Sequence, residues 1–389
     1  ARQHQRTLID LLAPLGIEVE LLTGSLKAAD AGRTRGLLAS GMARIVVGTH
    51  ALISESVQFA DLALAIVDEQ HRFGVEQRAA LEAKGGTLPH VLLMTATPIP
   101  RTLGQVLYAD LDVTDLRTPP VGRVAVRTGI RTFEDLAGTW DRVRAEAARG
   151  NRAFVVVPLI VEGEANDEPA LDLFGLPDES VIASTAVAAE AEAVRLRELL
   201  APLRVGLVHG RLKAADRDAE MARFRDGELD VLVGTTVVEV GVDVPEATMM
   251  IIESADRFGL AQLHQLRGRV GRGTEESFCV LVSDSTDETA RARLAAIRDE
   301  RDGFALAEKD WELRREGDVL GFEQSGLPGL RVASLQREDH RALAVEAREV
   351  AERILTDAGT LRAGHEALER ELRAGWLAPV ARGEAESGA

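Results

Sequence analysis

Apolar and polar residues follow one another along this chain in a pattern that predicts strands separated by helices. Short continuous runs of Val, Ile and Leu, such as Ile45–Val47, Leu62–Val67 and Val231–Val233, lie between stretches with helical periodicity. Such runs are typical of parallel strands covered on both faces. We therefore predict an α/β fold in which ligands bind beyond the carboxyl ends of the strands.

The same pattern occurs twice. Residues 24–30 read GSLKAAD and residues 210–216 read GRLKAAD, 186 positions later. RIVVGTHAL (44–52) matches DVLVGTTVV (230–238), and IVDEQHRFG (66–74) matches IIESADRFG (251–259) at an offset of 185. Because the matches keep their order and spacing, they predict two duplicated α/β domains.

The repeat also predicts where the domains begin and end. The strand run Phe154–Ile160 precedes the second repeat, and its counterpart in the first repeat would lie before Ala1. We therefore expect the first domain to be truncated on its N-terminal side, where a phosphate-binding loop usually lies. The expected domains are lobe 1 (1–122), lobe 2 (123–285) and a mostly helical, charged region (286–389).

The amino-acid composition argues against several classes of function. With 46 basic and 63 acidic residues the net charge is −17, which disfavours a protein that coats nucleic acid nonspecifically. A single cysteine, and histidines without metal-ligand spacing, argue against a zinc site. None of the four lysines is followed by Ser or Thr, so the sequence contains no P-loop. No apolar run is long enough to span a membrane, and we expect a cytosolic protein.

Two clusters could carry chemistry. Asp68 and Glu69 follow an apolar run directly, and buried carboxylates are costly unless they are used. In a nucleotide hydrolase the first would hold Mg²⁺ and the second would orient the attacking water; an ordinary polar strand end is the alternative. Arg267, Arg269 and Arg272 lie close together among glycines, either as ligands of a γ-phosphate or as a basic surface loop.

Small hydroxyl residues follow several of the expected strands. Thr49 and Thr235-Thr236 occupy equivalent strand ends, and Thr95 and Thr97 follow another apolar run. Hydroxyls at such places suit phosphate contacts that carry no base information. A plain turn containing Pro98 would explain Thr95 and Thr97 equally well.

These motifs resemble those of superfamily 2 helicases over about residues 1–285. The residues concerned are DEQH (68–71), TATP (95–98), VVEVGVDVP (237–245) and QLRGRVGR (265–272). The longer stretches DEQHRFGVEQR, TATPIPRTL and QLHQLRGRVGRG resemble the RecG family of bacterial DNA helicases. LAEKDWELRREGDVLGFEQSGLP (306–328) resembles a translocation motif that this family shares with the transcription-repair coupling factor.

The resemblance implies two RecA-like lobes in tandem and a role for each motif residue. Asp68 would bind Mg²⁺, Glu69 would be the catalytic base, and His71 and Gln265 would couple nucleotide to the lobes. Gly241 and Asp243 would face the ribose of ATP, and Arg269 and Arg272 its γ-phosphate. The implied DNA contacts are Thr49, His50, Thr95, Thr97, His209, Thr235, Thr236, Arg314 and Gln324.

The implied activity is ATP-driven translocation on double-stranded DNA that remodels replication forks and Holliday junctions. The implied protein acts as a monomer in the bacterial nucleoid and partners with single-stranded DNA-binding protein. A transcription-repair coupling translocase and a nucleotide-free DNA-binding regulator are the alternatives. Arg315, Glu316 and Glu323 depart from the usual translocation motif, which puts the geometry of that loop in doubt.

Overall fold

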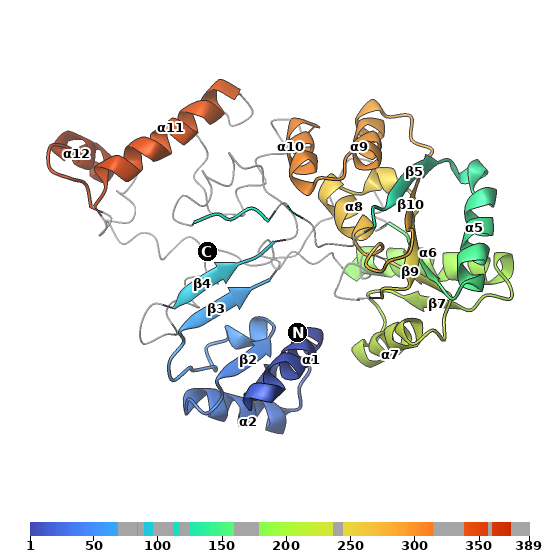
Figure 1. Cartoon of the computed structure of the whole chain (residues 1–389), viewed down its shortest axis with the longest axis horizontal. Coiled ribbons are helices and arrows are strands. Elements are labelled where there is room, and N and C mark those ends of the chain that lie inside the picture. Colours follow the sequence, from blue (N-terminus) through green and yellow to red (C-terminus); the bar gives the residue numbers. More distant parts are fainter. Residues whose placement is uncertain are drawn as a thin grey trace. The chain divides into compact units, whose positions relative to one another are not determined.

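The computed structural model describes residues 1–68, 84, 89–95, 112–116, 118, 124–158, 179–235, 244–313, 338–356 and 360–374. The chain divides into two compact units. The first comprises residues 1–98, 118–313 and 324–326 and contains every strand of the described residues (Figure 1); the second comprises residues 99–117, 314–323 and 327–389. Over the described ranges, no helix is long and apolar enough to cross a membrane.

Lobe 1 contains two separate pairs of parallel strands, β1 with β2 and β3 with β4. A small apolar cluster around Leu22, Leu38 and Val57 packs helix α2 against the first pair. The elements in chain order are α1 (Arg2–Leu12), η1 (Ala13–Leu15), β1 (Val19–Leu22), α2 (Ala28–Ala39), β2 (Ile45–Gly48), η2 (His50–Leu52), β3 (Leu64–Val67) and β4 (His90–Leu93).

The expectation of a buried strand over Leu62–Val67 is wrong for most of that run. The strand begins at Leu64, and only Val67 within it is buried. Leu64 is 56% exposed and Ile66 is 58% exposed. The physical reason is that, in the described part of lobe 1, β3 is paired on one side only, with β4. Asp68 therefore follows a strand that is largely open to solvent.

Lobe 2 forms one six-stranded parallel sheet with the strand order β5-β10-β9-β6-β8-β7. The parallel α/β architecture predicted from the apolar runs is confirmed. Its elements are β5 (Arg127–Arg131), η4 (Phe133–Asp135), α5 (Ala137–Ala148), β6 (Arg152–Val156), α6 (Glu179–Leu199), β7 (Val205–Val208), α7 (Ala214–Arg225), β8 (Val231–Gly234), β9 (Ala247–Ile252), η6 (Ala255–Arg257), α8 (Leu260–Arg267) and β10 (Phe278–Val282).

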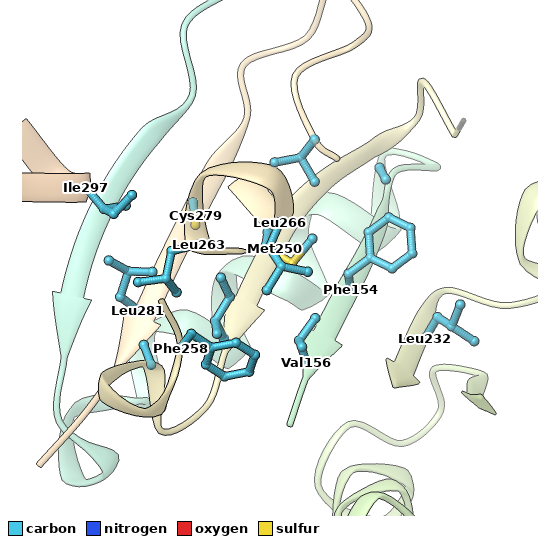
Figure 2. Close-up of a cluster of buried hydrophobic side chains, with 14 of the residues drawn as sticks. Phe154, Val156, Leu232, Met250, Phe258, Leu263, Leu266, Cys279, Leu281 and Ile297 are labelled. Carbon is cyan, nitrogen blue, oxygen red and sulfur yellow. The ribbon is translucent and has the colours of Figure 1, made fainter. Parts of the chain in front are cut away.

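Both faces of this sheet are covered, and the pleat divides each strand between them. In β6, Ala153 and Val155 join a core beneath α5 and α6, which includes Trp140. Phe154 and Val156 point to the other face and join a core with residues of α7, α8 and α9. Figure 2 shows both in one cluster with Leu266 of α8 and Ile297 of α9. Continuous apolar strands are therefore required here, because alternate side chains enter different cores.

Local signals end and begin the helices that surround the sheet. Helix α7 is followed by Gly227, whose positive φ of 80° suits glycine after a helix C-terminus. Asp287 caps α9 by accepting a hydrogen bond of 2.7 Å from the backbone N–H of Ala290. The remaining helices are α9 (Glu288–Asp299), α10 (Gly303–Leu313), α11 (Glu338–Ile354) and α12 (Glu366–Ala374).

The strands of lobe 2 are more deeply buried than those of lobe 1, and equivalent residues of the two lobes allow a matched test of what that burial contributes to stability. Val233 in β8 is fully buried, whereas its repeat counterpart Val47 in β2 is only half-buried. We expect Val233→Ala to cost about 2 kcal/mol, from lost transfer free energy and a cavity, and Val47→Ala to cost about 1 kcal/mol or less. Hydrogen exchange of the β8 and β2 amides measures both local opening free energies. Equal losses of stability would contradict the conclusion that β8 is more deeply buried than β2.

Candidate functional site

Four strands of the lobe 2 sheet end at the same level. Their last paired residues are aligned across the sheet: Val208, Gly234, Val156 and Ile252. The next residues on three of these strands are polar, namely His209, Thr235 and Glu253. The register thus brings residues from three distant parts of the sequence into one row at the carboxyl edge, where ligands of parallel sheets bind.

His209 is almost completely buried within this row. Its Nε2 lies 3.4 Å from a carboxylate oxygen of Glu190, and its Nδ1 has no hydrogen-bond partner among the described residues. Burial lowers the pKa of His209, and the opposing effect of Glu190 is smaller. The imidazole is therefore neutral near pH 7, so a charged contact with a DNA phosphate is not favoured for this side chain. Thr235 is equally buried.

Glu253 lies at the centre of a second group of charges. Its carboxylate is 3.5 Å from Arg195, which also donates a 2.8 Å hydrogen bond to Glu192 and lies over the ring of Trp140. Burial, then the charge of Glu192 and a hydrogen bond with it, raise the pKa of Glu253 to about 8 against the smaller opposing effect of Arg195. At neutral pH this carboxyl therefore holds a proton, which makes it a poor cation ligand.

The equivalent edge of lobe 1 is open to solvent. Thr49 follows β2, and its backbone N–H donates a 3.3 Å hydrogen bond to the carbonyl oxygen of Leu22. Asp68 follows β3 with about half of its side chain exposed, and its Oδ2 lies 3.5 Å from Nε2 of His4. His50 is also exposed, at the start of a 3-10 helix. The polar groups of this edge can thus reach a ligand directly.

Thr95 is the last described residue after β4, two positions beyond Leu93, which pairs with Val67. It is therefore near the end of the strand next to β3, as the sequence predicted. Its side chain is exposed.

The three arginines at and just after the end of helix α8 have different environments. Arg267 is buried and donates hydrogen bonds of 2.7 Å to the carbonyl oxygens of Ile297 and Glu300. These carbonyls lie at the C-terminal end of α9, where a cation also stabilises the helix dipole. Arg269 is half-buried, whereas Arg272 is exposed with its Nε 3.2 Å from the carbonyl oxygen of Gly268. Arg267 is therefore a structural residue, whereas Arg269 and Arg272 are less buried.

The arginine loop, residues 268–277, lies at the amino edge of the lobe 2 sheet. A Cβ on Gly271 would come within 2.7 Å of Val126, and one on Gly273 within 2.8 Å of the carbonyl oxygen of Pro245; both neighbours precede strands. Gln265 is half-buried one turn earlier on α8. The arginines and the His209 row therefore occupy opposite edges of one sheet.

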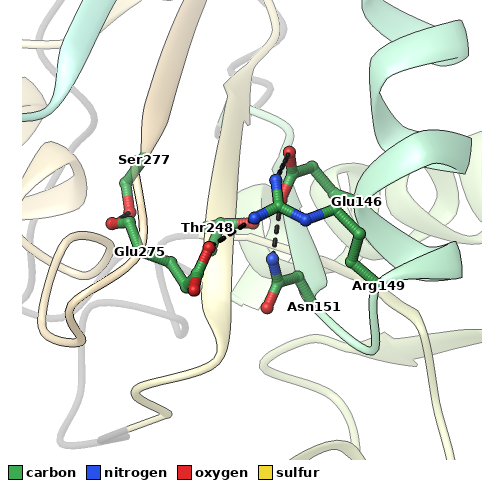
Figure 3. Close-up of polar contacts among 6 residues, drawn as sticks. All are labelled: Glu146, Arg149, Asn151, Thr248, Glu275 and Ser277. Carbon is green, nitrogen blue, oxygen red and sulfur yellow. Dashed lines mark hydrogen bonds and ion pairs between the residues drawn. The ribbon is translucent and has the colours of Figure 1, made fainter.

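A buried polar network holds the end of the arginine loop (Figure 3). Glu146 on α5 accepts hydrogen bonds of 2.7 Å from Asn151, 3.0 Å from Thr248 and 3.3 Å from Arg149. Arg149 also pairs with Glu275 in the loop. Three donors compensate for the burial of the Glu146 carboxylate, which links α5 and β9 to the residues just after Arg272.

Several sequence-predicted residues lie outside the described residues, so their positions stay predictions. They are Glu69, His71, Thr97, Thr236, Gly241, Asp243, Arg314 and Gln324.

Comparisons with known families cover both lobes. A DEAD/DEAH box helicase model matches residues 1–106, and a helicase conserved C-terminal domain model matches residues 173–274. The ATP-dependent DNA helicase RecG of Escherichia coli is 47% identical over 343 residues, and that of Mycobacterium tuberculosis is 46% identical over 370. This chain is a homologue of the RecG helicases.

The chain spans less than half of these RecG relatives. The matches cover 87% and 90% of this chain but 47% and 48% of the Escherichia coli and Mycobacterium tuberculosis proteins. RecG from Synechocystis is 44% identical over 93% of this chain and 41% of its own length.

Solved structures agree with the two-lobed α/β fold. A RecG bound to a three-way DNA junction is 37% identical and has a TM-score of 0.64, covering 89% of this chain and 42% of that one. Saccharomyces cerevisiae Dbp5 bound to RNA and ADP BeF3 has a TM-score of 0.51 over 78% of this chain and 72% of that one. At 15% identity, the second likeness shows the fold alone. The two RecA-like lobes that the RecG resemblance implied are confirmed.

The sequence did not reveal the charged group around Glu253. Its i, i+3 pair of Glu192 and Arg195 is a visible signal, but the same spacing is common on exposed helices. Nothing in the sequence indicates that Glu253 faces that pair. Similarly, the spacing of the three arginines in this sequence does not distinguish Arg267, which is buried, from Arg272, which is exposed.

Glu253 should make the stability of lobe 2 depend on pH. Its folded pKa of about 8 exceeds the value of roughly 4.3 in an unfolded chain. The folded state therefore retains the proton longer, and this contribution to stability is lost as pH rises from about 4.5 to about 8. We expect Glu253→Gln to remove part of that slope, by at most about 1.4 kcal/mol per pH unit.

Urea unfolding at a series of pH values measures this effect. Glu198→Gln, at an exposed position on α6, is the matched control and should leave the slope unchanged. If Glu253→Gln and wild type show the same pH dependence between 5 and 8, Glu253 is ionised in the folded chain.

Proposed function

We propose that this chain is the motor portion of an ATP-driven translocase that moves on double-stranded DNA and remodels branched junctions. The observation that carries the proposal is the match, over 89% of the chain, to a RecG solved on a three-way DNA junction. The identities of 44–47% to RecG proteins favour this over the transcription-repair coupling translocase. Replication forks and Holliday junctions are the proposed substrates.

The proposed motor consists of lobe 1 (1–122), lobe 2 (123–285) and a helical region (286–389) that couples lobe movement to DNA. Arg314 and Gln324 would provide that coupling. We propose that it acts as a monomer in the bacterial cytoplasm, where the nucleoid lies, with single-stranded DNA-binding protein as a partner.

The lobe 1 edge fits a magnesium nucleotide. Asp68 presents a half-exposed carboxylate, a hard oxygen ligand of the kind Mg²⁺ prefers. Among the described residues no group of three His, Cys, Asp or Glu is suited to a metal, and nucleotide-bound Mg²⁺ normally takes one or two carboxylates with phosphates and water. Asp68 would hold the ion, which neutralises charge that develops on the phosphates.

The remaining roles belong to side chains of this chain. Glu69 would accept a proton from the attacking water, and His71 and Gln265 would couple the nucleotide to the lobes. Arg269 and Arg272 would approach the γ-phosphate, and Gly241 and Asp243 the ribose. The sequence holds no P-loop lysine, so these 389 residues do not by themselves provide the usual triphosphate cradle. We therefore expect negligible ATP hydrolysis by this chain alone.

DNA would be held mainly through its backbone. Thr49, His50 and Thr95 are exposed at the lobe 1 edge and can donate hydrogen bonds to phosphates. His209 and Thr235 are buried, so we propose that the backbone amides around them, with Thr97 and Thr236, make the contacts of their regions. Contacts of this kind suit a motor that must move along any sequence.

Replacement of the proposed base tests the hydrolytic assignment. In a chimera that carries this chain in place of the matching region of Escherichia coli RecG, Glu69→Gln should retain nucleotide binding. Turnover should fall by roughly 10²–10⁴-fold, because the amide preserves shape but cannot accept the proton. DNA-stimulated ATPase rates and nucleotide dissociation constants are the measurements. Turnover near that of the unmodified chimera would exclude Glu69 as the base.

Arg272 tests the role of the arginine loop in the same chimera. Arg272→Ala should lower kcat by roughly 10³-fold with little change in nucleotide affinity, since the contact should strengthen in the transition state. Arg225→Ala, an exposed arginine at the end of α7, is the control and should leave both values unchanged. If affinity falls and kcat is retained, Arg272 binds the ground-state phosphate instead.

A further inference from the structure

The arginine loop carries as many acidic as basic side chains. Arg269 and Arg272 are followed within the loop by Glu275 and Glu276, so the loop alone has no net charge. Glu275 is three positions from Arg272, which places their Cα atoms at most about 11 Å apart. Carboxylates this close to a phosphate site weaken it, because they repel the phosphate and attract the arginines. A phosphate-binding role for this loop therefore requires that its glutamates be held elsewhere.

Each glutamate of the loop forms an ion pair with an arginine from another element. Arg149, at the C-terminal end of α5, has a guanidinium nitrogen 2.5 Å from a carboxylate oxygen of Glu275, as Figure 3 shows. Arg127, the first residue of β5, approaches Glu276 to the same distance of 2.5 Å. The carboxylates of two consecutive residues are thus both paired outside the loop. This pairing leaves the loop with an excess of positive charge from its own arginines.

The backbone on both sides of Arg272 packs closely against lobe 2. Gly271 has a φ of 73°, and a Cβ there would come within 2.7 Å of Val126. A Cβ on Gly273 would come within 2.8 Å of the backbone oxygen of Pro245. Arg272 lies between these two close approaches, yet its side chain is exposed. The path of the loop is therefore set by lobe 2, and the side-chain pairs decide which charges surround Arg272.

The two arginines that pair with the loop differ in what else they hold. Arg149 also donates a 3.3 Å hydrogen bond to Glu146, which is buried. Removal of the Arg149 side chain would therefore leave a buried carboxylate with one donor fewer, besides releasing Glu275. Arg127 is exposed, and the 2.8 Å hydrogen bond from its backbone N–H to Ser277 does not depend on its side chain. Replacement of Arg127 is thus the cleaner test of what such a pair does.

We propose that Arg127 and Arg149 are positioning residues that hold Glu276 and Glu275 away from Arg272, and so keep the arginine loop receptive to phosphate. The inference rests on the proposed contact of Arg272 with the γ-phosphate of ATP. Each positioning arginine acts through its glutamate and not on the nucleotide. When such an arginine is removed, the released carboxylate competes with the phosphate for Arg272.

The two partners of one pair should therefore have unequal effects on turnover. In the chimera with Escherichia coli RecG, Arg127→Ala releases Glu276 and should lower kcat by about threefold to fivefold, the range for an exposed ion pair. Glu276→Ala removes the competing carboxylate, so alone or combined with Arg127→Ala it should leave kcat within about twofold of the unmodified chimera. A pair that only braced the loop would give equal losses and no rescue.

Ionic strength provides a readout that a merely structural role would not move. DNA-stimulated ATPase rates at saturating DNA and ATP are compared with those of the unmodified chimera at low and high salt. The defect of Arg127→Ala should shrink as salt rises, because the attraction between Glu276 and Arg272 is screened. Arg298→Ala, which breaks an exposed pair with Asp299 on α9, is the matched control and should leave kcat unchanged. Amide hydrogen exchange in β5 and β10 of this chain should be the same with and without Arg127→Ala, which verifies folding.

Arg272→Ala supplies the background that distinguishes this inference from the proposed function. In that background Arg127→Ala should have no further effect, since the residue through which it acts is gone. A further loss there, or a loss that Glu276→Ala does not rescue, would overturn the inference and leave the role of Arg272 intact. If Arg272→Ala itself leaves kcat unchanged, the assignment of Arg272 is wrong, and the inference fails with it.

Discussion

The central strand β6 is the element on which the order of lobe 2 depends. It pairs with β8 on one side and β9 on the other, and its register aligns Gly234 and Ile252 across the sheet. Because parallel strands in fixed register end together, Thr235 and Glu253 are held in one row although β8 and β9 do not pair with each other. Both faces of β6 are buried, so a shift of one residue would exchange the two cores and is strongly disfavoured.

The sequence was sufficient to predict the fold because the fold depends on the periodicity of the apolar residues and on their burial. Continuous runs such as Val231–Val233 predicted parallel strands, and the repeat offset of 186 predicted that β1–β2 would match β7–β8, as their identical register shows. The same reasoning was wrong about the burial of Leu64 and Ile66. An apolar run shows that the side chains of a strand are suited to burial. Whether they are buried depends on the neighbouring strands and helices, which the run itself does not specify.

The candidate site was harder to predict from the sequence than the fold, because the role of a residue there depends on the environment of its side chain. Motif spacing placed Arg267 and Arg272 in one group, yet the hydrogen bonds of Arg267 to Ile297 and Glu300 make it part of the core. An arginine with buried carbonyl partners cannot leave them without leaving those carbonyls unpaired. Residues beyond the described ranges, Glu69 and Asp243 among them, are supported by the RecG motifs alone.

Asp68 and Glu253 show how one fold position can acquire opposite chemistry. Both follow the equivalent strand of their lobe, and both carry a carboxyl group. Asp68 is half-exposed, with its Oδ2 3.5 Å from His4, so its carboxyl group is open to water and to a ligand. Glu253 is buried against Glu192, and its pKa of about 8 keeps it protonated at neutral pH. Burial, rather than the presence of a carboxyl group, therefore decides which of the two residues suits the proposed metal, and it favours Asp68.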